Sequence, residues 1–160
     1  MGQLALTRVD YRMIHGQTVF KWMTLCTIDR IILVCDSLLK DPFMAGVYKN
    51  AANGKAVDII GLKDLQATVD AKNDKIMLIF VSVEDAYTAF KNGFNMSELN
   101  IGAVQMDKEK TRRDVVQGVA ISPKEFDQLL EMKSAGMKIF FQAIPERGAT
   151  SLDSVKNKFK

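Results

Sequence analysis

The single histidine of this 160-residue chain, His15, follows two arginines whose spacing suits phosphoryl chemistry. Arg8 and Arg12 precede it, and the carboxylate of Asp10 stands between them. A neutral imidazole is a nucleophile, and planar guanidinium groups bind phosphoryl oxygens through paired hydrogen bonds. A lone histidine is more often a surface or structural residue, so the neighbouring cations carry the hypothesis that His15 is reactive.

Most other common enzyme signatures are missing from the sequence. There is no G-x-x-x-x-G-K-[ST] phosphate loop and no G-x-G-x-x-G fingerprint, so we expect no nucleotide cofactor. One histidine excludes H-E-x-x-H, and no G-x-S-x-G elbow accompanies it. Cys26 and Cys35 do not form a C-x-x-C pair and predict buried free thiols in place of a metal site.

The composition is that of an ordinary globular protein, with 48% apolar and 26% charged residues. The length predicts one domain over residues 1–160. A net charge of +3, from 22 basic and 19 acidic residues, is too mild to indicate a nucleic-acid partner.

The densest basic cluster comprises Lys108, Lys110, Arg112 and Arg113, and Glu109 interrupts it. We expect a solvated loop there. The alternative is a docking patch for an acidic protein surface.

No segment of the sequence predicts export or membrane insertion. The N-terminus lacks a basic stretch followed by an apolar core, and the longest apolar run, residues 76–81, is far shorter than a spanning helix of about 20 residues. We therefore expect a cytoplasmic protein that reaches the inner face of the membrane only through a partner.

Seven segments rich in Val, Ile and Phe predict β-strands, at residues 4–9, 30–35, 56–60, 75–81, 99–104, 118–121 and 137–142. Several are apolar almost throughout, which is typical of strands buried on both faces of a parallel sheet. Amphipathic segments between them predict helices at residues 18–25, 42–52, 62–71 and 83–91, and another after a capping box at 122–125 that ends near Gly136. The tail at 151–160 predicts a terminal helix.

This alternation favours an open, twisted, mostly parallel α/β sheet of about seven strands with helices on both faces. In such folds, ligands bind beyond the carboxyl ends of the strands. His15 follows the first predicted strand at that end, Asp36 the second and Ser82 the fourth. Position and chemistry therefore agree for His15.

Residues 8–17, RVDYRMIHGQ, closely resemble the phosphohistidine loop of the IIB subunits in the mannose/fructose/sorbose family of the bacterial sugar phosphotransferase system. The pattern of that family is R-[IV]-D-D-R-L-I-H-G-Q. Residues 31–36 with Asp41-Pro42, residues 98–102 (ELNIG) and residues 136–145 also resemble family segments, so the resemblance covers nearly the whole chain.

Two positions depart from the family pattern. Tyr11 stands where a second aspartate is most common, which weakens any role for a carboxylate there. Ala103 stands where a second glycine is common, which affects how that strand end approaches a phosphate.

The resemblance implies that His15 is the catalytic residue, phosphorylated on Nδ1. Arg8 and Arg12 would neutralise the phosphoryl oxygens; the alternative for one of them is a structural pair with Asp10. Gly16 would let backbone N–H groups approach the phosphate. Gln17 would donate one more hydrogen bond, or merely open the next helix.

Supporting roles are expected for two carboxylates. Asp10 would orient an arginine or the imidazole N–H, or only stabilise a turn. Asp36 would line the cleft, although a helix cap is the simpler interpretation. Phe20 and Trp22 are expected to face the core.

The function implied by the resemblance is that of a phosphocarrier. It accepts a phosphoryl group from a phosphorylated IIA protein and passes it to a sugar presented by a IIC/IID membrane complex, without metal or cofactor. The same histidine would also serve a regulatory module that takes up phosphate without sugar transfer, or a hydrolase with a transient phosphohistidine. The identity of the sugar and the oligomeric state, including a homo-oligomer, stay open.

Overall fold

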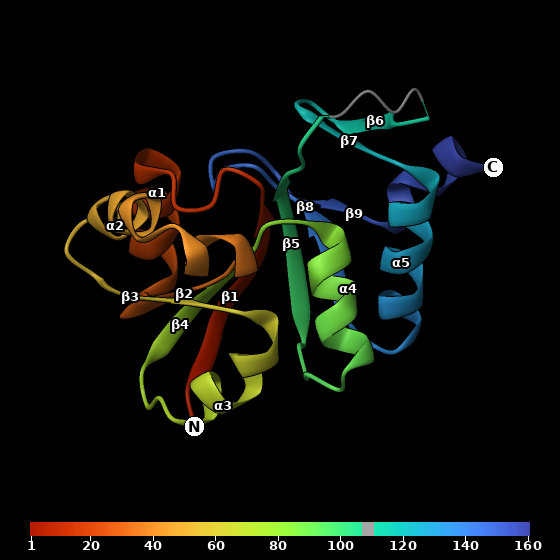
Figure 1. The fold of residues 1–160 in the computed structure, drawn as a ribbon. Helices are drawn as coiled ribbons and strands as arrows, with labels where there is room; N and C mark the ends of the chain where they lie inside the picture. The colour runs from red at the N-terminus through yellow and green to blue at the C-terminus, as the bar shows by residue number, and fades with distance from the viewer. Residues whose placement is uncertain (107–110) are drawn as a thin grey trace.

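A seven-stranded sheet forms the centre of the molecule (Figure 1). The computed structural model describes residues 1–106 and 111–160. The strands, in their spatial order, are β3 (Ala56–Ile60), β2 (Arg30–Val34), β4 (Lys75–Phe80), β1 (Gln3–Asp10), β5 (Glu98–Ala103), β8 (Lys138–Phe141) and β9 (Thr150–Ser151). The pairs from β3 to β8 are parallel, and β9 is antiparallel to β8. The predicted α/β class is confirmed.

Helices cover both faces of this sheet (Figure 1). One face packs against α1 (Gly16–Cys26) and α2 (Pro42–Asn50), and the other against α3 (Leu65–Asp70), α4 (Val83–Lys91) and α5 (Pro123–Ser134). Three 3-10 segments complete the described elements: η1 (Asp36–Lys40), η2 (Leu62–Asp64) and η3 (Asp153–Phe159). Within the described residues, no helix has the length and apolar character needed to span a membrane.

Alternate side chains of the central strands explain why both faces are covered. Met77 and Ile79 of β4 join the cluster under α1, whereas Leu78 and Phe80 join the cluster under α4 and α5. All four are essentially inaccessible to solvent. Since successive side chains of a strand point to opposite faces, an apolar strand of this kind needs a helix on each side.

The strand predicted at residues 118–121 is real but lies in a different place from the one expected. Its residues form β7 (Val119–Ile121), which pairs antiparallel with β6 (Arg113–Val116) in a separate two-stranded hairpin. Gly118 at the turn adopts a φ of +86°, a left-handed conformation that glycine reaches without a steric penalty. The seventh place in the main sheet is taken by β9.

The C-terminal segment contains less helix than the sequence predicts. Ser151 ends β9, and the residues after it form the 3-10 segment η3, which packs on α5. Phe159 stacks on Phe126 with ring centroids 4.4 Å apart, and Asp153 pairs with Lys133 of α5 and with Lys156. These contacts hold the end of the chain against α5.

Candidate active site

The loop between β1 and α1 stands at the carboxyl edge of the sheet and is built as a tight turn. One carboxylate oxygen of Asp10, the last residue of β1, accepts a hydrogen bond from the backbone N–H of Arg12 at 2.9 Å. The carbonyl of Asp10 accepts another from the N–H of Met13 at 3.0 Å. Met13 has a φ of +66°, an uncommon conformation for a residue with a side chain. The turn thereby delivers the chain to His15 at the start of α1.

His15 is exposed and precedes the first turn of α1 as its N-cap residue. Its side chain makes no capping hydrogen bond, and Nδ1 lies 3.5 Å from the hydroxyl of Thr18. The first amides of an α-helix have no partner inside the helix, and the helix dipole adds positive potential there. Gly16 and Gln17 begin α1, and its first turn carries no acidic residue. An anion attached to His15 is therefore favoured at this position.

Arg12 is held by two hydrogen bonds to a single carboxylate. Its Nε and Nη2 donate to the two oxygens of Asp10 at 3.1 and 3.0 Å, the bidentate geometry of a strong arginine–carboxylate pair. The hydrogen bonds that Arg12 donates to Asp10 raise the pKa of Arg12 above its ordinary value, so the guanidinium stays charged. The side chain of Arg12 keeps 32% of its surface exposed. Within the described residues its Nη1 makes no hydrogen bond, and it is available to an anion.

Arg8 occupies a different position from Arg12 and is 1% exposed. Its Nη1 donates to Asn100 and to the carbonyl of Gln142 at 2.9 Å, while its Nη2 donates to Asp10 at 3.3 Å and to the carbonyl of Ala143 at 2.7 Å. Burial lowers the pKa of Arg8 to about 10, against the opposing effect of Asp10, so the group is still protonated at neutral pH. Because its terminal nitrogens are bonded inside the protein, this geometry suits Arg8 to positioning Asp10. It does not suit direct contact with a group at the surface.

The support for Arg8 comes from β5, in residues that the sequence analysis singled out only as part of a family segment. Asn100 accepts from Arg8 through its Oδ1 and donates from Nδ2 to the carbonyl of Gln142 at 3.2 Å. Gly102 lies so close to Arg8 that a Cβ atom there would overlap its guanidinium. The guanidinium also lies over the ring of Trp22, with Cζ 5.3 Å from the centroid. Asn100 and Gly102 belong to the ELNIG segment noted in the sequence, but that segment does not indicate that Arg8 is their partner.

Asp36 does not join His15 in the structure. Its Oδ1 accepts from the N–H of Leu62 at 3.3 Å and lies against Gly61, in the loop that follows β3. Asp36 is not an N-cap residue, since it is the first residue of η1 after the N-cap Cys35, and its hydrogen bond links the ends of β2 and β3. Gln17 is exposed in the first turn of α1 and makes no side-chain hydrogen bond to the described residues.

The two aromatic residues predicted to face the core behave differently. Trp22 is buried and donates from its indole N–H to the carbonyl of Ala143 at 3.4 Å. Phe20 is 53% exposed, so its prediction was wrong. The sequence of residues 18–25 does not by itself show which face of α1 meets the sheet. In the structure, that face is formed by Val19, Trp22 and Met23, and Phe20 lies outside it. Both cysteines are free, with Cys35 buried and Cys26 half-buried.

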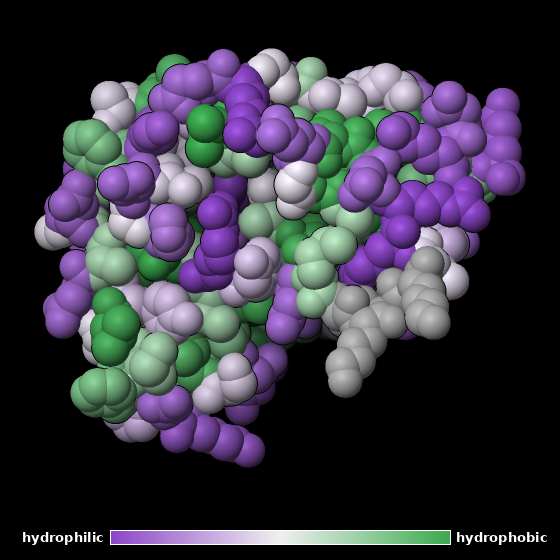
Figure 2. Space-filling view, turned by 90° about the horizontal axis from the view of Figure 1, so that it is seen from above, coloured by the Kyte–Doolittle hydropathy of each residue, from purple (hydrophilic) through white to green (hydrophobic). Residues whose placement is uncertain are grey.

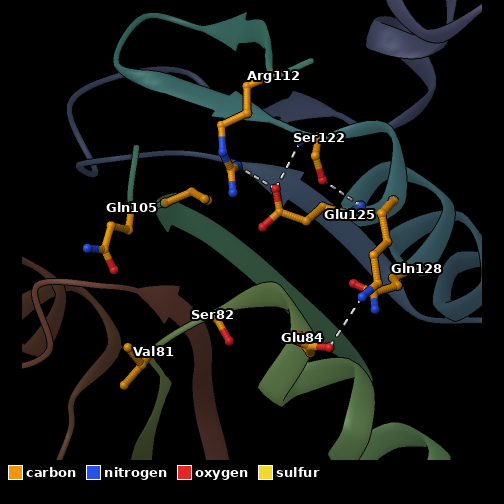
Figure 3. A pocket seen from close by; sticks show the side chains of 10 residues that line it. Val81, Ser82, Glu84, Gln105, Arg112, Ser122, Glu125 and Gln128 are labelled. Carbon is orange, nitrogen blue, oxygen red and sulfur yellow. Dashed lines mark hydrogen bonds and ion pairs between the residues drawn. The ribbon is translucent and has the colours of Figure 1, made fainter. Parts of the chain in front are cut away.

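A hollow of about 430 Å³ opens between the N-terminal ends of α4 and α5 (Figure 3). Its charged side chains pair with one another: Arg112 contacts Glu125 at 2.5 Å, and Lys124 contacts Glu84 at 3.5 Å. Glu125 also accepts from the N–H of Ser122 in the capping box of α5, as the sequence predicted. This network ties the segment before β6 to α5. Lys108 and Lys110 of the basic cluster lie outside the described residues.

The face that carries the strand ends is hydrophilic over much of its middle (Figure 2). Apolar side chains gather at its edge near α2, where Leu39, Phe43 and Val47 are exposed. In the part of the chain that the structure describes, no three His, Cys, Asp or Glu side chains gather closely enough to hold a metal ion. The groups available for chemistry beside the β1–α1 loop are therefore an imidazole, a guanidinium and helix N–H groups.

The sequence is similar to known proteins along most of its length. The family model of the PTS system sorbose subfamily IIB component matches residues 4–160. The sorbose-specific EIIB component of Lacticaseibacillus casei is 28% identical over 145 residues, which cover 88% of this chain and 87% of that protein. The N-acetylgalactosamine-specific enzyme IIB component 2 of Escherichia coli is 24% identical, over 95% of this chain and 98% of the relative.

Solved structures show the same fold. The crystal structure of manxB from Thermoanaerobacter tengcongensis superposes with a TM-score of 0.89 at 29% identity and covers 99% of this chain and 98% of its own. The IIBSor domain of the sorbose permease from Klebsiella pneumoniae superposes with a TM-score of 0.87 at 22% identity, over 99% and 98% of the two chains. With nearly its whole length matched, this chain belongs to the sorbose subfamily of PTS IIB components, which makes it a subunit of a sugar phosphotransferase.

Proposed function

We propose that the protein carries phosphate on His15, accepting it from a phosphorylated IIA protein and delivering it to a sugar held by a IIC/IID membrane complex. The observation that carries the proposal is the exposed imidazole at the N-terminus of α1, beside an arginine that Asp10 holds in place. Phosphoryl transfer depends mainly on positioning and on charge stabilisation, and this arrangement offers both.

In the first step, the lone pair of His15 Nδ1 attacks the phosphorus of the donor phosphohistidine. The P–N bond of the donor breaks, and its electron pair returns to the donor imidazole. In the second step, a sugar hydroxyl attacks the phosphorus on His15, its proton passes to solvent, and the N–P bond breaks with the electron pair staying on Nδ1. The first step needs a ring nitrogen whose lone pair is free and accessible, and the exposure of His15 gives the donor access to the ring.

The proposed roles of the other residues follow from their positions. Arg12 would bind phosphoryl oxygens through Nη1, and the N–H groups of Gly16 and Gln17 would stabilise the same charge from the helix end. Asp10 would fix Arg12, and Arg8 would fix Asp10. Each residue would thus position the next, from the buried Arg8 through Asp10 to Arg12 at the surface.

The proposed partners follow from the family and from the exposure of the site. The same phosphorus must be reached from the IIA side and from the permease side in turn, which requires an open histidine. The mannose-specific EIIAB component of Escherichia coli, which this chain matches over 43% of that protein's length at 22% identity, has a name that joins IIA and IIB. A IIA donor is the simplest partner for this chain too, with a place at the inner face of the membrane through IIC/IID.

The test is to incubate the protein with a phosphorylated IIA protein and map the acid-labile phosphate. Because the chain has one histidine, any phosphohistidine it forms must be at residue 15, and His15→Ala should take up none. Acid-stable label, or label that survives in His15→Ala, would reject the assignment. Adding membranes that contain IIC/IID then tests delivery, since a regulatory module would be phosphorylated without phosphorylating sugar.

A further inference from the structure

A smaller hollow of about 270 Å³ lies beside the β1–α1 loop, at the ends of β1, β5 and β8. Tyr11 and Arg12 form one side of it, and Arg147 comes from the loop after β8. The turn of the β6–β7 hairpin, Gln117 and Gly118, closes another side. Arg12 lines the hollow and His15 does not, so the hollow adjoins the proposed phosphorylation site.

The charged side chains that line this hollow are two arginines. Arg12 and Arg147 contribute positive charge, and no acidic residue lines the hollow within the part of the chain that the structure describes. Asp10, the carboxylate that pairs with Arg12, is buried, and its oxygens already accept hydrogen bonds from Arg8 and Arg12. The larger hollow between α4 and α5 differs in this respect, because its cations face carboxylates. Arg12 shares the single charge of Asp10 with Arg8, and Arg147 forms no ion pair with any described residue, so the hollow keeps a net positive charge.

Arg147 is fixed at its backbone, while its side chain is exposed. Its carbonyl accepts from Gln142 Nε2 at 2.6 Å, and its N–H donates to the carbonyl of Ile144 at 3.2 Å. Gln142 connects this loop to the network below, since its own carbonyl accepts from Arg8. The guanidinium of Arg147 makes no hydrogen bond or ion pair with any residue that the structure describes. Arg147 lines the hollow together with Arg12, whose Nη1 also makes no hydrogen bond to the described residues.

We infer that this hollow is an anion subsite in which Arg12 and Arg147 together hold the oxygens of a phosphoryl group. Two arginines that line one small hollow suit a tetrahedral dianion, because each guanidinium can bind oxygens through paired N–H groups. The inference rests on the proposed function for its biological meaning: the dianion is either the phosphoryl group carried by His15 or the phosphate of a sugar phosphate. Arg147 is a residue that neither the sequence analysis nor the family motif identified.

The test is a titration of the isotope-labelled full-length protein with inorganic phosphate, followed by NMR at constant ionic strength with chloride as the reference salt. We expect saturable shifts of the backbone amides of Gly118 and Arg147. Arg147→Gln should raise the Kd for phosphate about tenfold, because a charge-assisted contact is lost, and Arg147→Lys should recover part of the affinity. Lys124→Gln, which removes the same charge beside the other hollow, should leave the Kd unchanged. Equal Kd values for the wild type and Arg147→Gln, or no saturable shift at either amide, would overturn the inference.

Two further arms separate the sources of the anion. If the subsite holds the phosphoryl group on His15, phosphorylating His15 will shift the Gly118 amide and block inorganic phosphate. If it holds a free sugar phosphate, the phosphorylated protein will still bind a hexose 6-phosphate, and Arg147→Gln will weaken that binding.

Failure of this subsite and failure of the phosphocarrier function remain distinguishable. Phosphate binding that depends on Arg147 in a protein that never takes up phosphate on His15 supports the subsite and rejects the function. If His15 is phosphorylated normally but the Kd for phosphate does not depend on Arg147, the function is supported and the subsite is rejected.

Discussion

Replacing Gly102 with alanine should destabilise the protein through a single buried arginine. A Cβ atom at this position would lie less than 3.0 Å from three guanidinium atoms of Arg8, a separation that real Cβ atoms essentially never show. Arg8 cannot move aside cheaply, because it is bonded to Asn100, Asp10 and two backbone carbonyls and lies over Trp22. The methyl group therefore forces the guanidinium out of its bonded position.

The size of the effect follows from what Arg8 leaves behind. Displacing one partner of a buried ion pair typically costs about 3–5 kcal/mol, because the other charge is left unpaired. We expect Gly102→Ala to lower the free energy of unfolding by about this amount, measured by urea denaturation with Trp22 fluorescence and circular dichroism. Gly148→Ala is the matched control: nothing lies within 4 Å of a Cβ atom there, so the change should stay within about 0.5 kcal/mol.

A double-mutant cycle isolates the contact. Arg8→Met removes the guanidinium that the new methyl group would strike, so adding Gly102→Ala in that background should cost less than about 1 kcal/mol. An equal cost in both backgrounds would show that Gly102 acts through something other than Arg8. A cost below about 1 kcal/mol in the wild-type background would refute the close approach itself.

Three further predictions concern the site and the C-terminal segment. Arg12→Ala should slow phosphorylation of His15 by about 10- to 100-fold with the circular dichroism spectrum retained, because a charge-assisted contact is lost; unchanged kinetics would exclude Arg12 from the site. Thr18→Val should change the tautomer ratio of His15 in ¹⁵N NMR spectra, since the Thr18 hydroxyl lies 3.5 Å from Nδ1, and Thr18→Ser should not. Hydrogen bonds from Lys133 and Lys156 lower the pKa of Asp153 from 3.8 to about 2, so the stability it contributes is present above pH 3.8 and lost as the pH falls to about 2. Asp153→Asn should therefore show a smaller fall in melting temperature over that pH range, and an equal fall would contradict the pairing.

Much of the fold could be predicted because its signals are local. Residues 76–81 are apolar throughout, and β4 (Lys75–Phe80) is buried on both faces from Ile76 onward. The capping box at Ser122 and Glu125 formed as the sequence indicated. Such patterns depend on a few neighbouring residues, so they can be interpreted without knowledge of the tertiary structure.

The pairing of short strands could not be predicted in the same way. The residues of β7 are apolar, but their partner β6 begins with Arg113 and Asp114, which do not suggest a strand. Whether β7 joins the main sheet or a hairpin depends on the turn at Gly118 and on contacts far away in sequence. The 118–121 prediction therefore found the strand and missed its sheet.

The site was predictable in its residue types and only partly in its geometry. His15 and Asp10 follow from the loop after the first strand. Arg8 and Arg12 stand two residues to either side of Asp10, and nothing in that spacing shows which of them is buried. The difference in burial between Arg8 and Arg12 arises from β5, more than 90 residues away in sequence. There Asn100 accepts a hydrogen bond from Arg8, and Gly102 leaves room for its guanidinium.

The burial of Arg8 is costly unless it does something that a smaller apolar residue could not. Burial lowers its pKa, which reports that the charged form is disfavoured by its surroundings, and its Nε has no hydrogen-bond partner. A carboxylate held only by Arg12 could rotate with that exposed side chain, whereas Asp10 is held from beneath by Arg8 as well. The direction of the Arg12 guanidinium is then set by the rigid sheet and not by solvent. Changes in β5 that leave the surface untouched should accordingly alter the rate of phosphoryl transfer through the orientation of Arg12.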